Sequence, residues 1–199
     1  APTTTAAAPT TTAAATTAIS TTSAATSSTT LALPPGKDPA CLRRAHFGDP
    51  AESEYVLPYP AGEAYYVIRS YCAEGSGHRD QLAYDWFMPV GSELVAARGG
   101  WVVELRESSS DNGLGSRSEN YVYIEHADGS VAFYAHLMQD GVDVEVGRWV
   151  NQGEHIGYSG NSGATGGTAH LHFGVYRAMP RYEEMGIPVS FRNAAGELD

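Results

Sequence analysis

Positive charge and long apolar runs are both scarce in this 199-residue sequence. Lys and Arg number 12 against 23 acidic residues, which gives a formal net charge of −11 at pH 7. Nucleic acid and anionic membrane surfaces would repel such a chain, so we expect neither as a partner. Since no apolar stretch approaches the ~18 residues that a spanning helix needs, the sequence also predicts no membrane insertion.

Charged and aromatic side chains are absent from the first 30 residues, which comprise 13 Thr, 10 Ala, 4 Ser, 2 Pro and one Ile. Such a segment cannot bury enough apolar surface to offset the entropy of ordering it. Ser/Thr-rich tracts with Pro are typical of flexible stalks. We therefore expect residues 1–36 to be a disordered linker, residues 37–75 an extension that packs on the core, and residues 76–199 the main domain.

Cysteine is nearly absent as well, because the chain holds only Cys41 and Cys72. A disulfide between them is the favoured interpretation, and two unrelated buried thiols are the alternative. A stalk and a disulfide together favour a location outside the cytoplasm, either secreted, periplasmic or attached to the cell envelope. We expect a monomer.

Helix signals are few from residue 54 onward, and β-branched and aromatic runs punctuated by Gly, Asn and Asp take their place. These runs are 54–60, 64–73, 93–107, 120–137, 155–160 and 169–177. The Asp128-Gly129 pair predicts a hairpin over 120–137, and the polar stretch 107–120 is long enough to border a cleft. The sequence therefore predicts a mainly β fold, a small antiparallel sheet or sandwich with an open groove.

Two of the seven histidines stand two residues apart in a strand-like run, "AHLHF". His170 and His172 then share one face of the strand, while Leu171 and Phe173 share the other. Two imidazoles in one space suit zinc, which takes nitrogen and carboxylate ligands. The pair is equally compatible with polar residues on an outward face.

Other candidate site residues are less clear from the pattern alone. Asp85 lies between two aromatic residues, where a buried carboxylate needs a partner or a metal, although it is also placed to cap a turn. His136 ends "AFYAHL" on the face of Ala132 and Tyr134, which we take to be solvent or cleft rather than core. His46, His126 and His155 look like surface or turn histidines.

Five motifs occur in order between residues 76 and 177: D-W-F-M-P-V-G, A-A-R-G-G, Y-A-H-L, S-G-N-S-G and H-L-H-F. In this order they resemble the lysostaphin-type (LytM-type) zinc endopeptidases, metallopeptidase family 23. The resemblance implies a small antiparallel β fold of the duplicated-hybrid-motif type with a groove, a Zn²⁺ cofactor and peptidoglycan peptides as substrate. It matches Asp85 and His172 to metal ligands, and His136 and His170 to the non-ligand histidines of the active site.

The first ligand of the family pattern, a His four residues before the Asp, is Gln81 in this chain. Gln is a poor zinc ligand, so His78, seven residues before Asp85, is the candidate replacement if the backbone bulges between them. We also consider Tyr134 and Asn161 as substrate-binding residues. If zinc binds, His136 or His170 would take the proton of the attacking water and the other would contact the developing oxyanion.

Three functions remain open from the sequence. The first is a zinc endopeptidase of bacterial peptidoglycan. The second is a catalytically degenerate domain that regulates or activates cell-wall amidases, which the Gln81 departure favours. The third is an exported zinc peptidase that acts on proteins.

Overall fold

The computed structural model describes residues 36–75, 77–114, 118–179 and 185–194. The chain divides into two compact units, residues 1–32 and 33–199, and every described residue belongs to the second. The predicted linker therefore lies outside the described residues, except for Gly36. Within the described part, no helix is long and apolar enough to cross a membrane.

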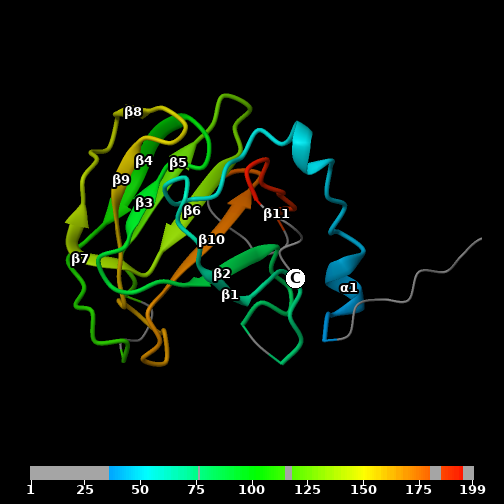
Figure 1. Ribbon diagram of the computed structural model, residues 1–199, viewed down its shortest axis with the longest axis horizontal. Helices are drawn as coiled ribbons and strands as arrows, with labels where there is room; N and C mark the ends of the chain where they lie inside the picture. Colours follow the sequence, from blue (N-terminus) through cyan, green and yellow to red (C-terminus); the bar gives the residue numbers. More distant parts are fainter. Residues whose placement is uncertain (1–35, 76, 115–117, 180–184, 195–199) are drawn as a thin grey trace, which may run out of the picture. The chain divides into compact units, whose positions relative to one another are not determined.

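Two antiparallel sheets make up nearly all of the regular structure (Figure 1). The larger sheet has the strand order β1-β2-β10-β6-β5-β4-β8, with β11 paired to β10, and the smaller has the order β3-β9-β7. The strands of the larger sheet are β1 (Tyr66–Arg69), β2 (Ala83–Phe87), β10 (His170–Tyr176), β6 (Val131–Ala135), β5 (Tyr121–Glu125), β4 (Gly100–Arg106), β8 (Trp149–Val150) and β11 (Gly186–Ile187). Those of the smaller sheet are β3 (Glu93–Val95), β9 (His155–Ser159) and β7 (Leu137–Val142). The mainly β, antiparallel prediction is confirmed.

Apolar side chains at alternate positions of the central strands form the main core. On β10 every residue is buried, and Leu171, Phe173 and Val175 all belong to the main cluster of buried side chains. Trp86 of β2 is fully buried in the same cluster, with its ring 6.2 Å from that of Phe173 and 5.6 Å from that of Phe191. The core face of β2 and β10 is thus filled by large apolar groups, which leaves their opposite face for the histidines.

The predicted hairpin over 120–137 is present as β5 and β6. Its turn closes with a hydrogen bond from the His126 backbone N–H to the Ser130 carbonyl, and the Asp128 carboxylate accepts from the Ser130 N–H. Gly129 has φ +80°, a conformation that glycine adopts without a Cβ clash. The Asp-Gly signal therefore marked the turn correctly.

The predicted faces of strand β6 are wrong. Ala132 and Tyr134 point into the main core, whereas Phe133 and Ala135 line the pocket on the other side of the sheet. The alternation rule failed because it was applied through His136, which lies just after the strand with φ +66°. A left-handed residue breaks the two-residue period, so His136 does not continue the face of Tyr134.

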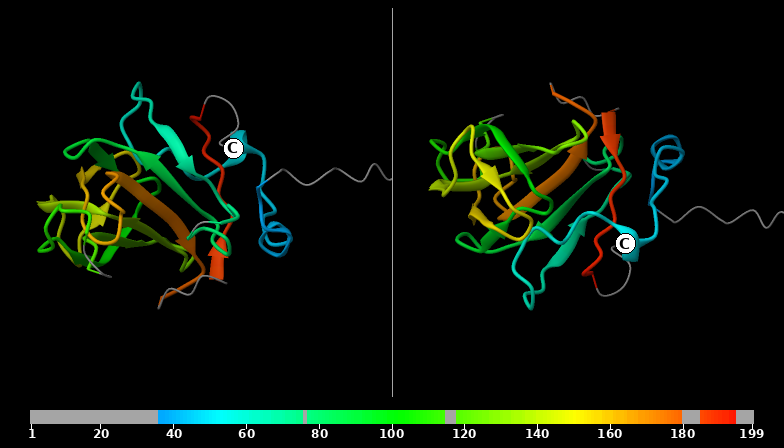
Figure 2. Two further views of the ribbon diagram at one scale, coloured as in Figure 1. Left: turned by 90° about the horizontal axis from the view of Figure 1, so that it is seen from below. Right: turned by 90° about the horizontal axis from the view of Figure 1, so that it is seen from above.

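The segment before β2 is tied together by the predicted disulfide, which joins Cys41 and Cys72. Both cysteines are fully buried. Cys41 lies in the short helix α1 (Pro39–Leu42), which Asp38 caps by accepting from the backbone N–H groups of Ala40 and Cys41. A 3₁₀ turn, η1 (Pro50–Glu52), follows. Figure 2 shows α1, in blue, at the end of the described unit opposite to β7 and β9. The boundary at residues 75 and 76 stays a prediction.

His126 occupies the predicted turn but is buried rather than exposed, with 3% of its surface accessible. Its Nδ1 lies 3.0 Å from the Gly99 carbonyl oxygen, and its ring packs edge-on against Tyr55. Burial lowers the pKa of His126 below its usual 6.5, and this outweighs the raising effect of the hydrogen bond to Gly99. The imidazole is therefore neutral in the folded protein at neutral pH.

This burial predicts a pH dependence of stability. Because the folded-state pKa is depressed, the unfolded chain takes up a proton at His126 first as the pH falls through about 6.5. As the pH falls further, from about 6.5 to the folded-state pKa, the free energy of unfolding therefore decreases. Urea titrations with a chelator present should show a smaller loss between about pH 7.5 and 5.5 for His126→Gln than for the unchanged chain. Equal losses would contradict the assignment.

Candidate metal centre and active site

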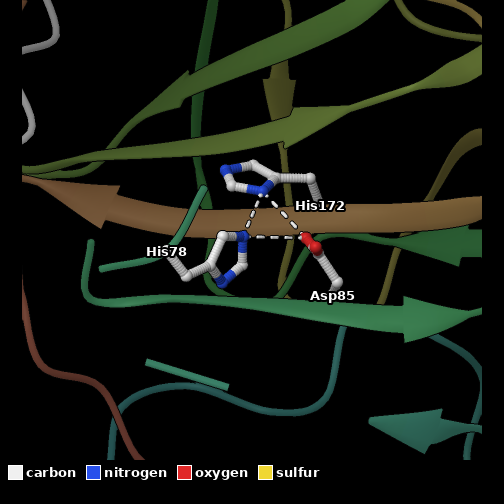
Figure 3. A group of neighbouring side chains, drawn as sticks. All are labelled: His78, Asp85 and His172. Atoms are coloured by element: carbon white, nitrogen blue, oxygen red, sulfur yellow. Dashed lines mark hydrogen bonds and ion pairs between the residues drawn. The ribbon is translucent and has the colours of Figure 1, made fainter. Parts of the chain in front are cut away.

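Three buried side chains meet at one point on the groove side of the larger sheet (Figure 3). The Asp85 Oδ1 lies 2.9 Å from the His172 Nδ1 and 3.1 Å from the His78 Nε2, and the two nitrogens are 3.1 Å apart. The accessible fractions are 1% for Asp85, 3% for His78 and 8% for His172. One carboxylate oxygen and two imidazole nitrogens therefore converge in a nearly solvent-free space.

The pairing of two strands places two of these three side chains, Asp85 and His172, next to each other. Strands β2 and β10 are antiparallel neighbours, and their register sets His172 directly opposite Asp85. Side chains of directly paired residues project to the same face, so both reach the groove. This pairing joins positions 87 residues apart in the sequence.

His78 arrives by a hydrogen-bonded turn rather than by the bulge that we expected. The Gln81 N–H donates to the His78 carbonyl at 3.1 Å, which closes a four-residue turn just before β2 begins. The turn is anchored at its end, because the Gln81 carbonyl accepts from the Cys72 N–H at 2.8 Å. The backbone therefore folds back over Asp85 and brings His78 beside it.

The orientation of the His78 ring is supported from the side away from Asp85. Its Nδ1 lies 3.4 Å from the Ser70 carbonyl oxygen. A carbonyl oxygen only accepts, so a proton on Nδ1 is satisfied by Ser70, and the Nε2, which is hydrogen-bonded to Asp85 without a metal, is the atom that would bind one. Metal-binding histidines commonly have such a second contact, which sets the tautomer that can bind a metal.

The three residues fit a zinc ion in chemistry and in spacing. Catalytic zinc sites commonly use three nitrogen or oxygen ligands and leave a fourth position open. Atoms bound to one zinc at about 2.1 Å lie roughly 3.3 Å from one another, so these three need to separate by only a few tenths of an ångström. Burial opposes ionisation of Asp85, but the hydrogen bonds with His172 and His78 outweigh it and hold the Asp85 pKa below its usual range. The carboxylate is thus charged and ready to bind a cation.

His136 and His170 form a second pair beside the first. Their ring centroids are 4.5 Å apart, and each ring is held by its Nδ1, at 2.8 Å from the Ser162 carbonyl for His136 and at 2.8 Å from the Thr168 carbonyl for His170. Both rings thus carry the proton on Nδ1 and have Nε2 as an acceptor. Burial is the main cause that lowers the pKa of each, so both are neutral bases near pH 7.

All five residues border one cavity of about 250 Å³. The structure therefore brings together His78, Asp85, His172, His136 and His170, and the separate role of each stays a prediction. Further lining residues are Arg69, Gly77, Gln81, Glu119, Phe133, Ala135 and Ala164. No role was predicted for Arg69, although it is the only cation in the strand-like run 64–73 and this could have marked it as a candidate.

Tyr134 does not contribute to this cavity, and the prediction that it binds substrate is wrong. Its side chain is fully buried, and its hydroxyl accepts from the Ala97 backbone N–H at 2.8 Å on the core face of the sheet. Burial also raises the pKa of Tyr134 far above its usual value. The residue supports the core instead.

Asn161 is likewise absent from the lining, contrary to our expectation. Its side-chain oxygen accepts from the Thr165 hydroxyl, and its backbone N–H donates to the Asp111 carboxylate at 2.8 Å. Asp111 also accepts from the Gln139 N–H, so these contacts tie three loops together. Asn161 therefore stabilises the loops beside the groove, and the structure gives it no contact in the groove itself.

Comparison with known proteins identifies the family of the chain. The sequence profile described as Peptidase family M23 matches residues 79–184, slightly more than half of the chain. The chain belongs to peptidase family M23. The resemblance to lysostaphin-type metallopeptidases is thereby confirmed, and His78 lies just before the matched range.

Curated relatives of the M23 chain are much longer proteins. It is 38% identical over 118 residues to peptidoglycan DD-endopeptidase ShyC of Vibrio cholerae, a match that covers 57% of this chain and 25% of the relative. It is 30% identical over 125 residues to cell division protein DipM of Caulobacter vibrioides, covering 62% and 18%. The chain thus spans a quarter or less of the length of these two relatives.

Among solved structures, the catalytic domain of lysostaphin from Staphylococcus simulans is 26% identical. The match covers 64% of this chain and 86% of that domain, with a TM-score of 0.45.

Proposed function

We propose that this M23 domain is a zinc-dependent endopeptidase that hydrolyses peptide bonds in bacterial cell-wall peptidoglycan, outside the cytoplasm. The main support is the convergence of His78, Asp85 and His172 within one cavity that also contains two neutral histidines. The name of the ShyC relative, a peptidoglycan DD-endopeptidase, supports the choice of substrate.

When bound by His78, Asp85 and His172, zinc supplies a Lewis acid that polarises the scissile carbonyl and makes a water molecule more acidic. His136 and His170 each present an Nε2 lone pair to the cavity, because their Nδ1–H groups are held by carbonyl oxygens. One of them takes the proton from the attacking water, and it can then pass that proton to the leaving amine. The other contacts the oxygen on which charge develops.

The left-handed backbone of His136 has a place in this scheme. A non-glycine residue with φ +66° is held against its intrinsic preference. Two contacts hold it, from its Nδ1 and from its carbonyl oxygen, which accepts from the Gly160 N–H at 2.9 Å. The ring therefore has a fixed position before substrate arrives.

The regulatory alternative depended on Gln81 as a sign of a lost ligand. The structure brings His78 into the cluster in its place, so the substitution at Gln81 no longer argues against metal binding. The DipM relative is named a cell division protein, so a role in cell division is a second candidate function for this chain.

Removing metal should separate the possible functions. Incubation with purified peptidoglycan should release new amino groups, a chelator should stop the release, and added Zn²⁺ should restore it. Release that continues without metal would overturn the proposal. Absence of both zinc binding and release would favour the regulatory function, and cleavage of unfolded protein in preference to peptidoglycan would favour a peptidase of proteins.

A further inference from the structure

Arg69 borders the active-site cavity but has no part in the hydrolysis described above. It is the last residue of β1, the edge strand of the larger sheet, and it pairs with Asp85 of β2 across a register shift after Val67. Its guanidinium Nη1 lies 3.6 Å from the Asp85 Oδ2, the carboxylate oxygen that does not contact His78 and His172. The cation therefore stands at the rim, next to the proposed metal ligands.

The charge pattern of the cavity singles Arg69 out. Among the described residues that line it, Arg69 alone carries a fixed positive charge, and the acids are Asp85 and Glu119. A guanidinium has five N–H donors in a planar fork suited to a carboxylate. At 3.6 Å the contact with Asp85 is too long for a hydrogen bond. The donors of Arg69 are thus available to a ligand that enters the cavity.

A purely supporting role for Arg69 fits the geometry less well. An arginine that orients a buried carboxylate is expected to bind it through two short parallel hydrogen bonds. The Arg69 side chain instead keeps 49% of its surface accessible, beside an Asp85 side chain at 2%. A single long, half-exposed ion pair contributes little to holding Asp85 in place.

Two exposed aromatic side chains lie near Arg69 at this edge of the sheet. Tyr66 of β1 pairs with Phe87 of β2, and Phe87 pairs in turn with His170 of β10. Tyr66 is 83% exposed and Phe87 is 44% exposed. Apolar surface thus lies beside the cation on the same strands, as expected where a peptide with an anionic group is bound.

We propose that Arg69 is a specificity-determining residue, which binds a free carboxylate on a residue of the substrate that directly flanks the scissile bond. This inference rests on the proposed peptidase function. Arg69 lies 3.6 Å from Asp85, one of the proposed metal ligands, so a carboxylate that it binds lies close to the bond that is cut. The substrate class is therefore cross-linked peptides that keep a free carboxylate beside the cross-link.

The test uses one cross-linked peptidoglycan dimer in two forms, with its carboxylates free and with the same carboxylates converted to amides. The unchanged chain should show a KM about tenfold or more lower for the free form, as expected for a charge-assisted hydrogen bond. Arg69→Gln should show equal KM values for both forms. Arg148→Gln is the matched control, because its side chain is 47% exposed, is paired with Glu154 and does not line the cavity, and it should keep the preference.

Two further measurements keep the outcome independent of turnover. Equilibrium binding of both dimers to the metal-free chain should show the same preference, lost in Arg69→Gln. Zinc affinity, measured by chelator competition, should change by less than about threefold in Arg69→Gln, well below the 10–100-fold typical when a contact that supports a ligand is removed.

Some results would overturn the proposal. Equal loss of activity on both dimers, or a zinc affinity weakened tenfold or more, would make Arg69 a positioning residue for Asp85. If neither dimer is cleaved by the unchanged chain, the peptidase function fails, yet the binding comparison on the metal-free chain still decides what Arg69 recognises.

Discussion

Replacing His78 with alanine should lower the zinc affinity of this domain more than 100-fold and remove hydrolysis with it. Removing a residue that only hydrogen-bonds to a metal ligand already lowers metal affinity by about 10–100-fold. Here one of the three ligands themselves would be lost. With Asp85 and His172 alone, the donor set is too small for a catalytic zinc site. His78 is only 3% accessible and lines the cavity beside Asp85 and His172, so its removal leaves only water to fill the third ligand position.

Gln81→Ala is the matched comparison, because Gln81 borders the same cavity and holds the position of the usual first ligand. Its Oε1 is buried and has no hydrogen-bond partner among the described residues. We expect zinc to stay bound in Gln81→Ala. Chelator competition on both variants gives the answer, and circular dichroism checks that each is folded. Zinc retained in His78→Ala but lost in Gln81→Ala would contradict the site as described.

Removing the disulfide should have the largest effect on stability. Cys41 and Cys72 are separated by 31 residues, and closing a loop of that length restricts the unfolded chain by about 3–4 kcal/mol. The free energy of unfolding of Cys41→Ala/Cys72→Ala should therefore fall by about that amount. Guanidinium titration in the presence of a chelator measures it without a contribution from bound zinc.

The same variant should also weaken zinc binding, for a local reason. Cys72 has φ +55°, and its N–H donates to the Gln81 carbonyl that ends the His78 turn. The Asp38 N–H in turn donates to the Cys72 carbonyl at 2.8 Å, and Lys37 contacts the Ser70 hydroxyl and the Tyr71 carbonyl. The disulfide thus anchors the segment that presents the Ser70 carbonyl to His78.

Two measurements can contradict this account. A loss of free energy of unfolding below about 1 kcal/mol would mean that the crosslink does not restrict the unfolded chain as the entropic estimate requires. Unchanged zinc affinity would mean that the turn holds His78 without help from the disulfide. His126→Ala/Ser130→Ala is a suitable control for zinc affinity, since both residues lie in the distant turn of the β5–β6 hairpin.

Much of this protein was determined by local sequence. The two-residue alternation of Leu171 and Phe173 with His170 and His172 predicted a strand with an apolar face and a histidine face, because a strand has only two sides. Asp128-Gly129 predicted the hairpin turn, since glycine accepts a left-handed backbone there. The motifs around Asp85, His136 and His172 were enough for the family, which the profile match confirms.

Only the tertiary structure decided the rest, because it depends on contacts between distant positions or on single backbone angles. Because His136 has a left-handed backbone, its side chain does not share a face with Tyr134, and Tyr134 packs in the core instead of the groove. The turn at 78–81 placed His78 beside Asp85, which spacing along the chain could not show. Pairing of the edge strand β1 with β2 brought Arg69 to the rim of the cavity, and no local pattern encodes which strand becomes the neighbour of which.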